Sequence, residues 1–597
     1  MKVSQVSVLF ASATHLSLSA ASFDGNINYG SPSPRHTQFG IDVTQVRRRS
    51  WKRGNVAFKP DELNFTHGIA SGDPWPNSVI LWTRIAPSSN STKNTAPIDG
   101  TEPLYSHETK KFVEADPNPI CLRWEVFKNG TKSVVSNGTA YTTADIDYTV
   151  KIEAKGLKPL TTYNYQFTVC DSNNTSPLGR TKTAPKPDDD ISEINLAVFS
   201  CSAFFPGYFN VYGNAARKDN HDWVVHLGDY IYEYVYMTIA PAMASTGLIP
   251  TSNYCPRIRP GSPLGMTTAK VADNAYRDGY VDFFDTGNTF IGKGPEVATD
   301  ARKANAVRAY FEWMPIRQTD MDDGLRVWRS FQLGVDYVNN KYIEKISNDP
   351  SRTLIGGRQE NWFYRSLSES SDRNATWRVI GNQIVFSHIK GDEAGGGDVW
   401  DGYIANRNRT LNHLYKNKIN NTIFLSGDSH MNWVSDLAWL GTKDYDPKTG
   451  EGAIGAEFAG TAVTSWSTSG ARLIEPDAGN ISRKAIKENK ELFWQEGYYR
   501  GYFQLSVSRE KVSAQFFGSP SIATHNSWEI SLANFTVFAG DNHIHRPENG
   551  IRVETGALKS GEVKHTNLTL NTETGVWEVR DFDKMYLNAA PDFLSSF

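Results

Sequence analysis

INLAVFSCS (residues 194–202) and DWVVHLGDYIYEY (residues 222–234) decide the class of fold. Each contains an apolar run of strand length that ends in polar residues, and the stretch between them is polar and compatible with a helix. TWRVIGNQIVFSHI (376–389) and NTIFLSGDSHMNW (421–433) repeat this design. Buried strands that alternate with helices predict a layered α/β domain over roughly residues 190–545. Sites in such sheets form outside the carboxyl ends of the strands, so the polar residues there are the first candidates for chemistry.

Residues 58–185 follow a different pattern, because short alternating runs such as CLRWEVF and YNYQFTVC lie between turn residues. GLKPLTTYNYQF carries a Tyr shortly after a Leu-x-Pro turn, as in the tyrosine corner of immunoglobulin-like and fibronectin-like sandwiches. An all-β N-terminal sandwich is therefore expected. Cys121 and Cys170 fall on two of its strands, which predicts a disulfide if the chain is secreted. Two buried free thiols are the alternative.

The two ends of the chain are expected to differ from these regions. Residues 1–21 are typical of a secretory signal, since a lysine precedes a weakly apolar run that ends in small residues, and a disordered tail is the alternative. Residues 22–57 are polar and end in a basic cluster, which indicates a linker, a processed pro-segment or a solvated arm. Residues 546–597 are interpreted as a β-type tail.

Composition excludes several classes of protein. The chain has 597 residues, with 62 basic and 65 acidic side chains and a formal charge of −3. Specific nucleic-acid binding is therefore not expected. Hydrophobic residues at 39% and charged residues at 21% exclude an intrinsically disordered chain. No apolar stretch approaches the length of about 18 residues that a transmembrane anchor needs.

Asn-x-Ser/Thr acceptors are spread from end to end, which fits a glycosylated protein that is secreted or extracellular, in the cell wall or in a vacuole. These acceptors begin at Asn64, Asn90, Asn129, Asn137, Asn173, Asn174, Asn374, Asn408, Asn420, Asn480, Asn534 and Asn567.

Side chains that bind metals stand at three of the predicted strand ends. The first strand gives Cys201, and the second gives Asp229 and Tyr232. The GDSH turn gives Asp428 and His430. Together these donors would form a mixed site in which hard oxygens predominate. A phenol with a pKa of about 10 ionises near neutrality only beside a strong Lewis acid. Tyr with Cys therefore favours Fe(III) over zinc, and the carboxylates could hold a second cation such as Ca²⁺.

Each candidate also has a purely structural interpretation. A Gly-Asp pair after a strand is common in turns, and Cys201 would fit a small site in the core. His226 is expected to pack or to orient its loop rather than to bind metal. Asp398 and Asp401, in GGGDVWDGY, either cap a helix or support the metal ligands.

FTHGIASGDPWPNSVILWTRIAP (65–87) resembles the opening of the N-terminal domain of the PhoD-like alkaline phosphatases. FSCSAFFPGYFNVYG, DWVVHLGDYIYEY, GGRQENWFYRSL, DVWDGY and IFLSGDSH follow in that family's order. The resemblance covers roughly residues 58–545, and the tail is similar to fungal members. It implies an immunoglobulin- or fibronectin-like β-sandwich followed by a four-layered α/β/β/α metallophosphoesterase domain of the calcineurin-like kind.

The resemblance also implies a function and a ligand set. Family members are secreted phosphomonoesterases or phosphodiesterases with an Fe(III)–Ca²⁺ centre, so phosphate esters are the expected substrates of a monomeric enzyme. Cys201, Asp229 and Tyr232 would bind the iron. Asp229 would also bridge to calcium, with Asp428 and His430 nearby, and Asp229 and His430 are the catalytic candidates. The implied chemistry is metal-assisted hydrolysis, in which an activated water attacks phosphorus in line.

Two family elements are missing from this sequence. Asn274, in KVADNAYRDGY, matches a family position next to the metals, but GMTTAKVADN stands where a Trp-Asp-Asp-His-Glu element should precede it. An apolar strand with Leu-Asp-Thr-Arg is also absent after RSFQLG. Either segments of a longer gene product have been skipped, or the chain is a catalytically impaired glycoprotein that still binds phosphate or metal. The first interpretation is favoured because the flanking matches stay close up to the gaps.

Overall fold

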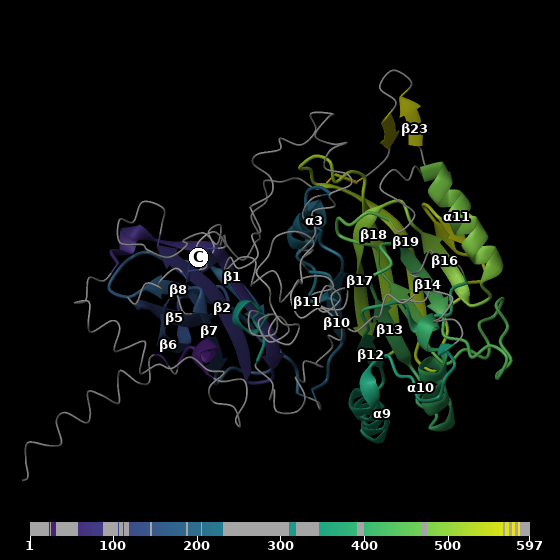
Figure 1. Cartoon of the computed structure of the whole chain (residues 1–597), viewed down its shortest axis with the longest axis horizontal. Coiled ribbons are helices and arrows are strands. Elements are labelled where there is room, and N and C mark those ends of the chain that lie inside the picture. The colour runs from purple at the N-terminus through teal and green to yellow at the C-terminus, as the bar shows by residue number, and fades with distance from the viewer. Residues whose placement is uncertain are drawn as a thin grey trace, which may run out of the picture.

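The structure is a computed structural model and is a mixed α/β fold with mostly sheets and few helices (Figure 1). It describes residues 23, 25–30, 58–87, 105–106, 111–112, 119–143, 146–186, 189–203, 206–230, 310–317, 346–390, 399–467, 475–564, 568–571, 576–579 and 583–584.

The N-terminal part contains two antiparallel sheets. One sheet has the order β1-β2-β7, with β1 (Leu63–Trp75), β2 (Ser78–Pro87) and β7 (Thr149–Lys155). The other has the order β6-β5-β8-β9, with β5 (Ile120–Lys128), β6 (Val134–Thr142), β8 (Thr162–Val169) and β9 (Gly179–Lys182). Inward-facing apolar side chains such as Leu81, Val150, Leu122 and Phe167 form one core between them. Shorter elements are η3 (Pro60–Glu62), β3 (Tyr105–Ser106) and β4 (Lys111–Phe112).

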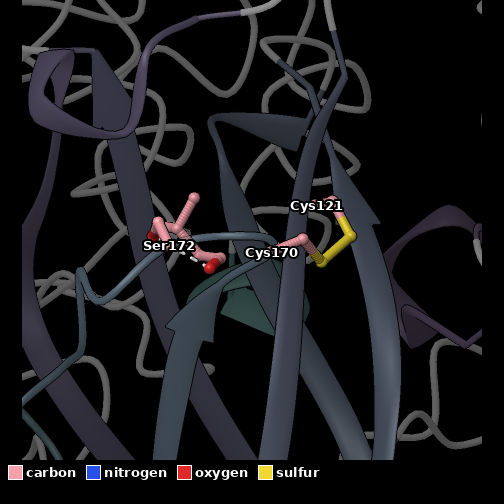
Figure 2. Close-up of a disulfide and its surroundings, with 4 residues drawn as sticks. Cys121, Cys170 and Ser172 are labelled. Carbon is pink, nitrogen blue, oxygen red and sulfur yellow. Dashed lines mark hydrogen bonds between the residues drawn. A yellow bond between two sulfur atoms is a disulfide. The ribbon is translucent and has the colours of Figure 1, made fainter.

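Two local features of this part follow from its sequence. The Tyr163 hydroxyl accepts a hydrogen bond from the backbone N–H of Lys158 at 2.8 Å, which is the contact a tyrosine corner makes. Cys121 on β5 and Cys170, which follows β8, form a disulfide with a Cα–Cα distance of 5.4 Å (Figure 2). In the turn after Cys170, the Ser172 hydroxyl donates to the Val169 carbonyl at 3.0 Å. The disulfide therefore fixes the end of β8 against β5.

Residues 25–30, which the sequence placed in a linker or pro-segment, pack against the N-terminal sheets. They include the short helix η1 (Ile27–Tyr29). The buried Asn26 donates through Nδ2 to the carbonyls of Tyr141 and Thr149, both at 3.0 Å. Tyr29 is buried and its hydroxyl lies 2.9 Å from the Thr143 hydroxyl. The segment is thus part of the folded N-terminal region and not a solvated arm.

The rest of the described chain is built on two mixed sheets of six strands each. The first has the order β11-β10-β17-β18-β19-β25, with β10 (Glu193–Phe199), β11 (Trp223–His226), β17 (Arg500–Ser508), β18 (Lys511–Ser519), β19 (Trp528–Phe538) and β25 (Asp583–Lys584). The second has the order β12-β13-β15-β14-β16-β21, with β12 (Arg378–Gly381), β13 (Thr422–Ser426), β14 (Asn432–Asp436), β15 (Ala456–Ala459), β16 (Leu492–Glu496) and β21 (Ala557–Leu558). Two short pairs complete the strands: β20 (Arg552–Val553) with β22 (Glu562–Val563), and β23 (Leu568–Asn571) with β24 (Val576–Val579).

These two sheets share a large apolar core, which includes Phe503 and Phe516 from the first sheet and Phe458 and Trp494 from the second. The helix α3 (Asn210–Lys218) packs on Phe199 and Tyr502 of the first sheet. The other helices pack on the second sheet (Figure 1). They are α9 (Gly356–Asp372), η6 (Trp400–Tyr403), α10 (Ile404–Lys416) and α11 (Glu475–Glu488).

The parallel strands of both sheets end in turns that bond to one another. β10 pairs in parallel with β11, and β12 pairs in parallel with β13. Beyond these strands, the Cys201 N–H donates to the Gly228 carbonyl at 3.2 Å, and the Gly427 N–H donates to the Gln383 carbonyl at 3.0 Å. The N–H of Val463, beyond β15 of the second sheet, donates to the carbonyl of Ser200, beyond β10 of the first sheet, at 2.9 Å. This hydrogen bond joins the two sheets. The strand ends therefore form one connected platform.

Candidate metal centre

Cys201 and Asp229 lie in the turns that follow β10 and β11. Both have a left-handed backbone, with φ of 62° at Cys201 and 51° at Asp229. The Ser202 N–H donates to the Asp229 carbonyl at 2.8 Å, which ties the two turns together. The Cys201 thiol in turn donates to Asp229 Oδ2 at 3.6 Å. The sharp reversals thus bring the thiol and the carboxylate to the same place.

Asp428 and His430 lie in the turn that follows β13, and both again have positive φ, at 70° and 56°. Residues other than glycine adopt this conformation at a free-energy cost, and such strain concentrates at functional sites. Nδ1 of His430 lies 2.6 Å from the Trp466 carbonyl. Because a carbonyl only accepts, Nδ1 carries the proton and Nε2 keeps its lone pair for a ligand.

Ligand atoms of Cys201, Asp229 and His430 all lie within 4.8 Å of one another. Within the described ranges this is the one group of three or more His, Cys, Asp or Glu side chains with that property. Zinc, for comparison, bonds to sulfur at about 2.3 Å and to nitrogen or oxygen at about 2.0–2.2 Å. Two donors on one cation therefore lie at most about 4.5 Å apart, so small side-chain adjustments would let all three reach a shared ion.

The protonation states of this cluster suit a cation. Burial lowers the pKa of His430 to about 4, although the nearby Asp229 acts in the opposite direction. A neutral imidazole at neutral pH is the form that coordinates metals. A thiolate, an imidazole and a carboxylate together match metals of intermediate softness such as iron or zinc. The donor set therefore fits a metal ion.

Arg500, at the start of β17, is a member of the site that the sequence did not indicate. Its guanidinium is buried and donates to the carbonyl of Ser465 at 2.7 Å and of Gly497 at 3.0 Å. Burial lowers the pKa of Arg500 to about 10, while the charges of Glu496 and Cys201 act to raise it. A lone charged residue at the start of the strand RGYFQLSVS is the signal that the sequence offers.

His226 lies beside the turns that carry Cys201 and Asp229 and does not belong to the three-residue cluster. Its Nε2 lies 3.0 Å from the hydroxyls of both Ser202 and Tyr212. The Gly228 N–H points at its Nδ1 at 3.4 Å, which makes Nδ1 the acceptor and Nε2 the donor. Burial lowers the pKa of His226 to about 3, so the ring stays neutral. It therefore holds the two turns together by neutral hydrogen bonds.

The other predicted site residues have mixed outcomes. Asp428 shares the His430 turn but lies outside the cluster of 4.8 Å. Asp401 pairs with His388, with Oδ1 and Nδ1 at 2.7 Å, and does not belong to the three-residue cluster. Tyr232, Asn274 and Asp398 lie outside the described residues.

Comparison with known protein families shows to which family the chain belongs. The sequence matches the family described as "PhoD-like phosphatase" over residues 196–253 and 270–516. It also matches "PhoD-like phosphatase, N-terminal domain" over residues 50–185. The chain belongs to the PhoD-like phosphatase family. Membership supports a phosphatase or phosphoesterase function with phosphate-ester substrates, and it suggests metal cofactors.

Two PhoD proteins show how far the similarity extends. Alkaline phosphatase D of Bacillus subtilis (strain 168) is 30% identical over 548 residues, which is 85% of this chain and 87% of that protein. A solved structure of PhoD has a TM-score of 0.56 at 24% identity, and the match covers 85% of this chain and 95% of that one. At that identity the structural match is evidence for the fold alone.

The PhoD-like match also bears on the missing family elements. It is interrupted between residues 253 and 270, and this gap overlaps GMTTAKVADN, where the Trp-Asp-Asp-His-Glu element is absent. Both places with a missing element lie outside the described residues. Among the residues that are described, no helix is long and apolar enough to cross a membrane.

Proposed function

We propose that the chain is a metal-dependent phosphatase that hydrolyses phosphate monoesters, phosphodiesters or both. The observation that carries this proposal is the convergence of Cys201, Asp229 and His430 from three separate turns in a member of a phosphatase family. In-line phosphoryl transfer needs positioned positive charge more than covalent chemistry. A cation held by these three side chains would supply that charge.

The proposed cations are Fe(III) and Ca²⁺, following the family resemblance. Cys201, Asp229 and Tyr232 would hold the iron, and Asp229 would be shared with calcium. The other members of the ligand set are Asn274, Asp428 and His430. When bound, such cations neutralise phosphoryl oxygens and lower the pKa of a water molecule. The proposed catalytic residues are Asp229 and His430.

Elemental analysis of the purified chain tests the metal content directly. We expect iron together with calcium in the wild type, and loss of iron in Cys201→Ser and Tyr232→Phe. Cys255→Ser is the matched control, since it makes the same chemical change at a cysteine that the resemblance leaves outside the ligand set. Equal iron in Cys201→Ser and Cys255→Ser would contradict the proposed centre.

Hydrolysis of p-nitrophenyl phosphate and of its bis-ester, with and without calcium, tests the activity and separates the two ester classes. We expect turnover that Tyr232→Phe abolishes. Bound iron and calcium without turnover of either ester would favour the alternative of a catalytically impaired phosphate- or metal-binding protein. Absence of both metals would reject the proposal.

We also propose the finer architecture and the location. Separate cores support an immunoglobulin-like sandwich at residues 58–185 and a four-layered metallophosphoesterase domain at 190–545. The disulfide and the exposed Asn-x-Ser/Thr acceptors support secretion and glycosylation. The exposed acceptors in the described ranges are Asn64, Asn129, Asn137, Asn173, Asn374, Asn420, Asn480 and Asn534.

A further inference from the structure

Gln383 is a polar residue at the strand-end platform that the proposed mechanism has not used. It lies two residues beyond β12. Its carbonyl accepts a hydrogen bond at 3.0 Å from the N–H of Gly427, the residue directly before Asp428. Its side chain reaches the other ligand-bearing turn as well. Gly228 is the residue directly before Asp229. The Gln383 Cγ lies 3.8 Å from the position that a Cβ on Gly228 would take. Gln383 therefore contacts both turns that carry acidic metal-ligand candidates.

The Nε2 atom of Gln383 is buried without a hydrogen-bond partner in the described part of the chain. Nε2 is screened from solvent, and nothing in the part of the chain that the structure describes accepts its protons. Buried amide donors are almost always paired, because an unpaired one loses its bonds to water without replacement. An orphan donor next to a candidate active site therefore indicates a group that arrives with the ligand.

The surroundings hold Gln383 in place for such a ligand. The preceding Asn382 donates from its backbone N–H to the Leu425 carbonyl at 2.8 Å. Three residues after Gln383, the Phe386 N–H donates to the buried Glu457 carboxylate at 2.7 Å. Binding groups work best when they are preorganised in this way, because little conformational entropy is lost when the ligand binds.

The chemistry of the amide limits what the ligand can be. An N–H group only donates, so its partner is an acceptor and not a cation. At a site for phosphate esters, the acceptor that the substrate brings is a non-bridging phosphoryl oxygen. Neutral amides of this kind stabilise developing oxyanions when they are placed beforehand.

We propose that Gln383 is a substrate-binding residue that donates a hydrogen bond from Nε2 to a non-bridging oxygen of the phosphoryl group. This inference rests on the proposed phosphatase function. It assigns Gln383 to recognition of the phosphoryl group common to monoesters and diesters, and not to the metal.

Binding of inorganic phosphate to the metal-loaded protein, followed by titration calorimetry, tests the proposal. Gln383→Met keeps the length of the side chain but removes the donor, and we expect phosphate to bind about tenfold more weakly. We expect the ligand-free variant to unfold at the same or a higher temperature than the wild type, because the unpaired amide is gone. A merely structural glutamine would instead lower the melting temperature and leave phosphate affinity unchanged.

Gln383→Glu separates a donor from a metal ligand. If the side chain donates to phosphate, the carboxylate repels the anion, so affinity falls further than in Gln383→Met while metal content stays constant. If the side-chain oxygen bound metal instead, Gln383→Met would lose metal while Gln383→Glu would keep it, and this result would overturn the inference. Gln515→Met, on the polar outer face of β18, is the control and should leave phosphate affinity unchanged.

The outcomes separate this inference from the proposed function. Wild-type protein that binds metals and phosphate, with Gln383→Met binding phosphate equally well, would overturn the role of Gln383 alone. Wild-type protein that binds neither metal nor phosphate would overturn the phosphatase proposal and the inference with it.

Discussion

His388 and Asp401 form an ion pair, and this pair should make the stability of the fold depend on pH. Nδ1 and Oδ1 lie 2.7 Å apart, and the His388 side chain is 38% exposed. The hydrogen bond to Asp401 raises the pKa of His388 against the effect of burial. The charge of Arg407 lowers it, and the charges of Asp401 and Glu491 raise it. The folded state therefore binds this proton more tightly than the unfolded chain does.

This pair should stabilise the fold at acidic pH and lose its effect as pH rises. Because the pKa of His388 is raised on folding, its contribution to the free energy of unfolding is fully present below the unfolded-state pKa of about 6.5. This contribution is lost as the pH rises past the pKa of the folded state. Because His388 is partly exposed, we expect a change of no more than about 1 kcal/mol in the free energy of unfolding. Urea unfolding at about pH 6 and about pH 8.5 measures it, and Asp401→Asn should flatten the difference. An unchanged difference in Asp401→Asn would assign the pH dependence to other groups.

The adjacent acceptors Asn173 and Asn174 should differ in glycosylation if the chain passes through a secretory pathway. Asn173 is exposed, whereas Asn174 Nδ2 donates to the carbonyls of Pro60 at 2.7 Å and Leu63 at 2.8 Å. A glycan replaces one amide hydrogen, so modification of Asn174 would break one of these bonds. Mass spectrometry of the peptide should find the glycan on Asn173. Thr175→Ala removes only the Asn173 acceptor motif, so a glycan that persisted would contradict this assignment.

The elements of the fold were only partly predictable from sequence. The apolar runs predicted β10, β11, β12 and β13, because strand burial and strand ends are local signals. The antiparallel half of each sheet was not predicted: β17 pairs with β10 from a distant part of the chain and brings Arg500 with it. A side chain such as Gln383 gains its meaning only from burial and missing partners, which no local pattern encodes.

β12 also ends earlier than the apolar run around it suggests, and Glu457 explains why. The strand stops at Gly381, and the N–H groups of Phe386 and Ser387 donate to the Glu457 carboxylate at 2.7 and 2.8 Å instead of to a neighbouring strand. The Ser426 hydroxyl donates to the same carboxylate at 2.5 Å. A fully buried side chain on β15 thus fixes the segment that carries Gln383.

Glu457→Gln should therefore destabilise both the fold and the phosphate site. One carboxylate oxygen becomes an NH₂ group that faces backbone donors, so we expect the free energy of unfolding to fall by about 2–4 kcal/mol. Phosphate affinity should also fall, because residues 382–387 lose their anchor. Urea unfolding and phosphate titration measure the two effects. The exposed Glu451→Gln is the control and should change neither; a loss of stability with full phosphate affinity would show that Glu457 does not position the site.

At the scale of the whole molecule, residues 310–317 dock on the N-terminal sheets and form a junction with them. The Glu312 carbonyl accepts hydrogen bonds from Trp82 Nε1 and Asn28 Nδ2, both at 2.9 Å. Asn28 belongs to the N-terminal segment that packs on the same sheets, so three distant stretches meet here. Arg180 and Lys182 of β9 add ion pairs to Asp219 and Asp222, which lie between α3 and β11. The N-terminal part therefore anchors the chain that carries the site.

Arg317 makes several contacts with the N-terminal sheets at once. It donates through Nε and Nη2 to Glu153 Oε1 at 3.1 and 2.9 Å, and its guanidinium lies 4.4 Å from the centre of the Trp75 ring. Its backbone N–H donates to Asp73 Oδ2 at 2.9 Å. Burial alone would raise the pKa of Glu153, but hydrogen bonds from Arg317 and Ser78 bring it below its usual value. The contribution of Glu153 to the free energy of unfolding is therefore present above about pH 4.5, and it is lost as the carboxylate takes up a proton at lower pH.

Arg317→Lys should weaken the junction although the charge is kept, because an ammonium cannot reproduce the planar fork. We expect the free energy of unfolding at neutral pH to fall by about 2–3 kcal/mol. Below about pH 4 the difference from the wild type should shrink as Glu153 is protonated in both proteins. Arg552→Lys is the matched control, since its pair with Glu562 is exposed and should be worth less than about 0.5 kcal/mol. Equal losses in the two variants would mean that the junction contributes no more than a surface ion pair, and the N-terminal part would then not anchor residues 310–317 through Arg317.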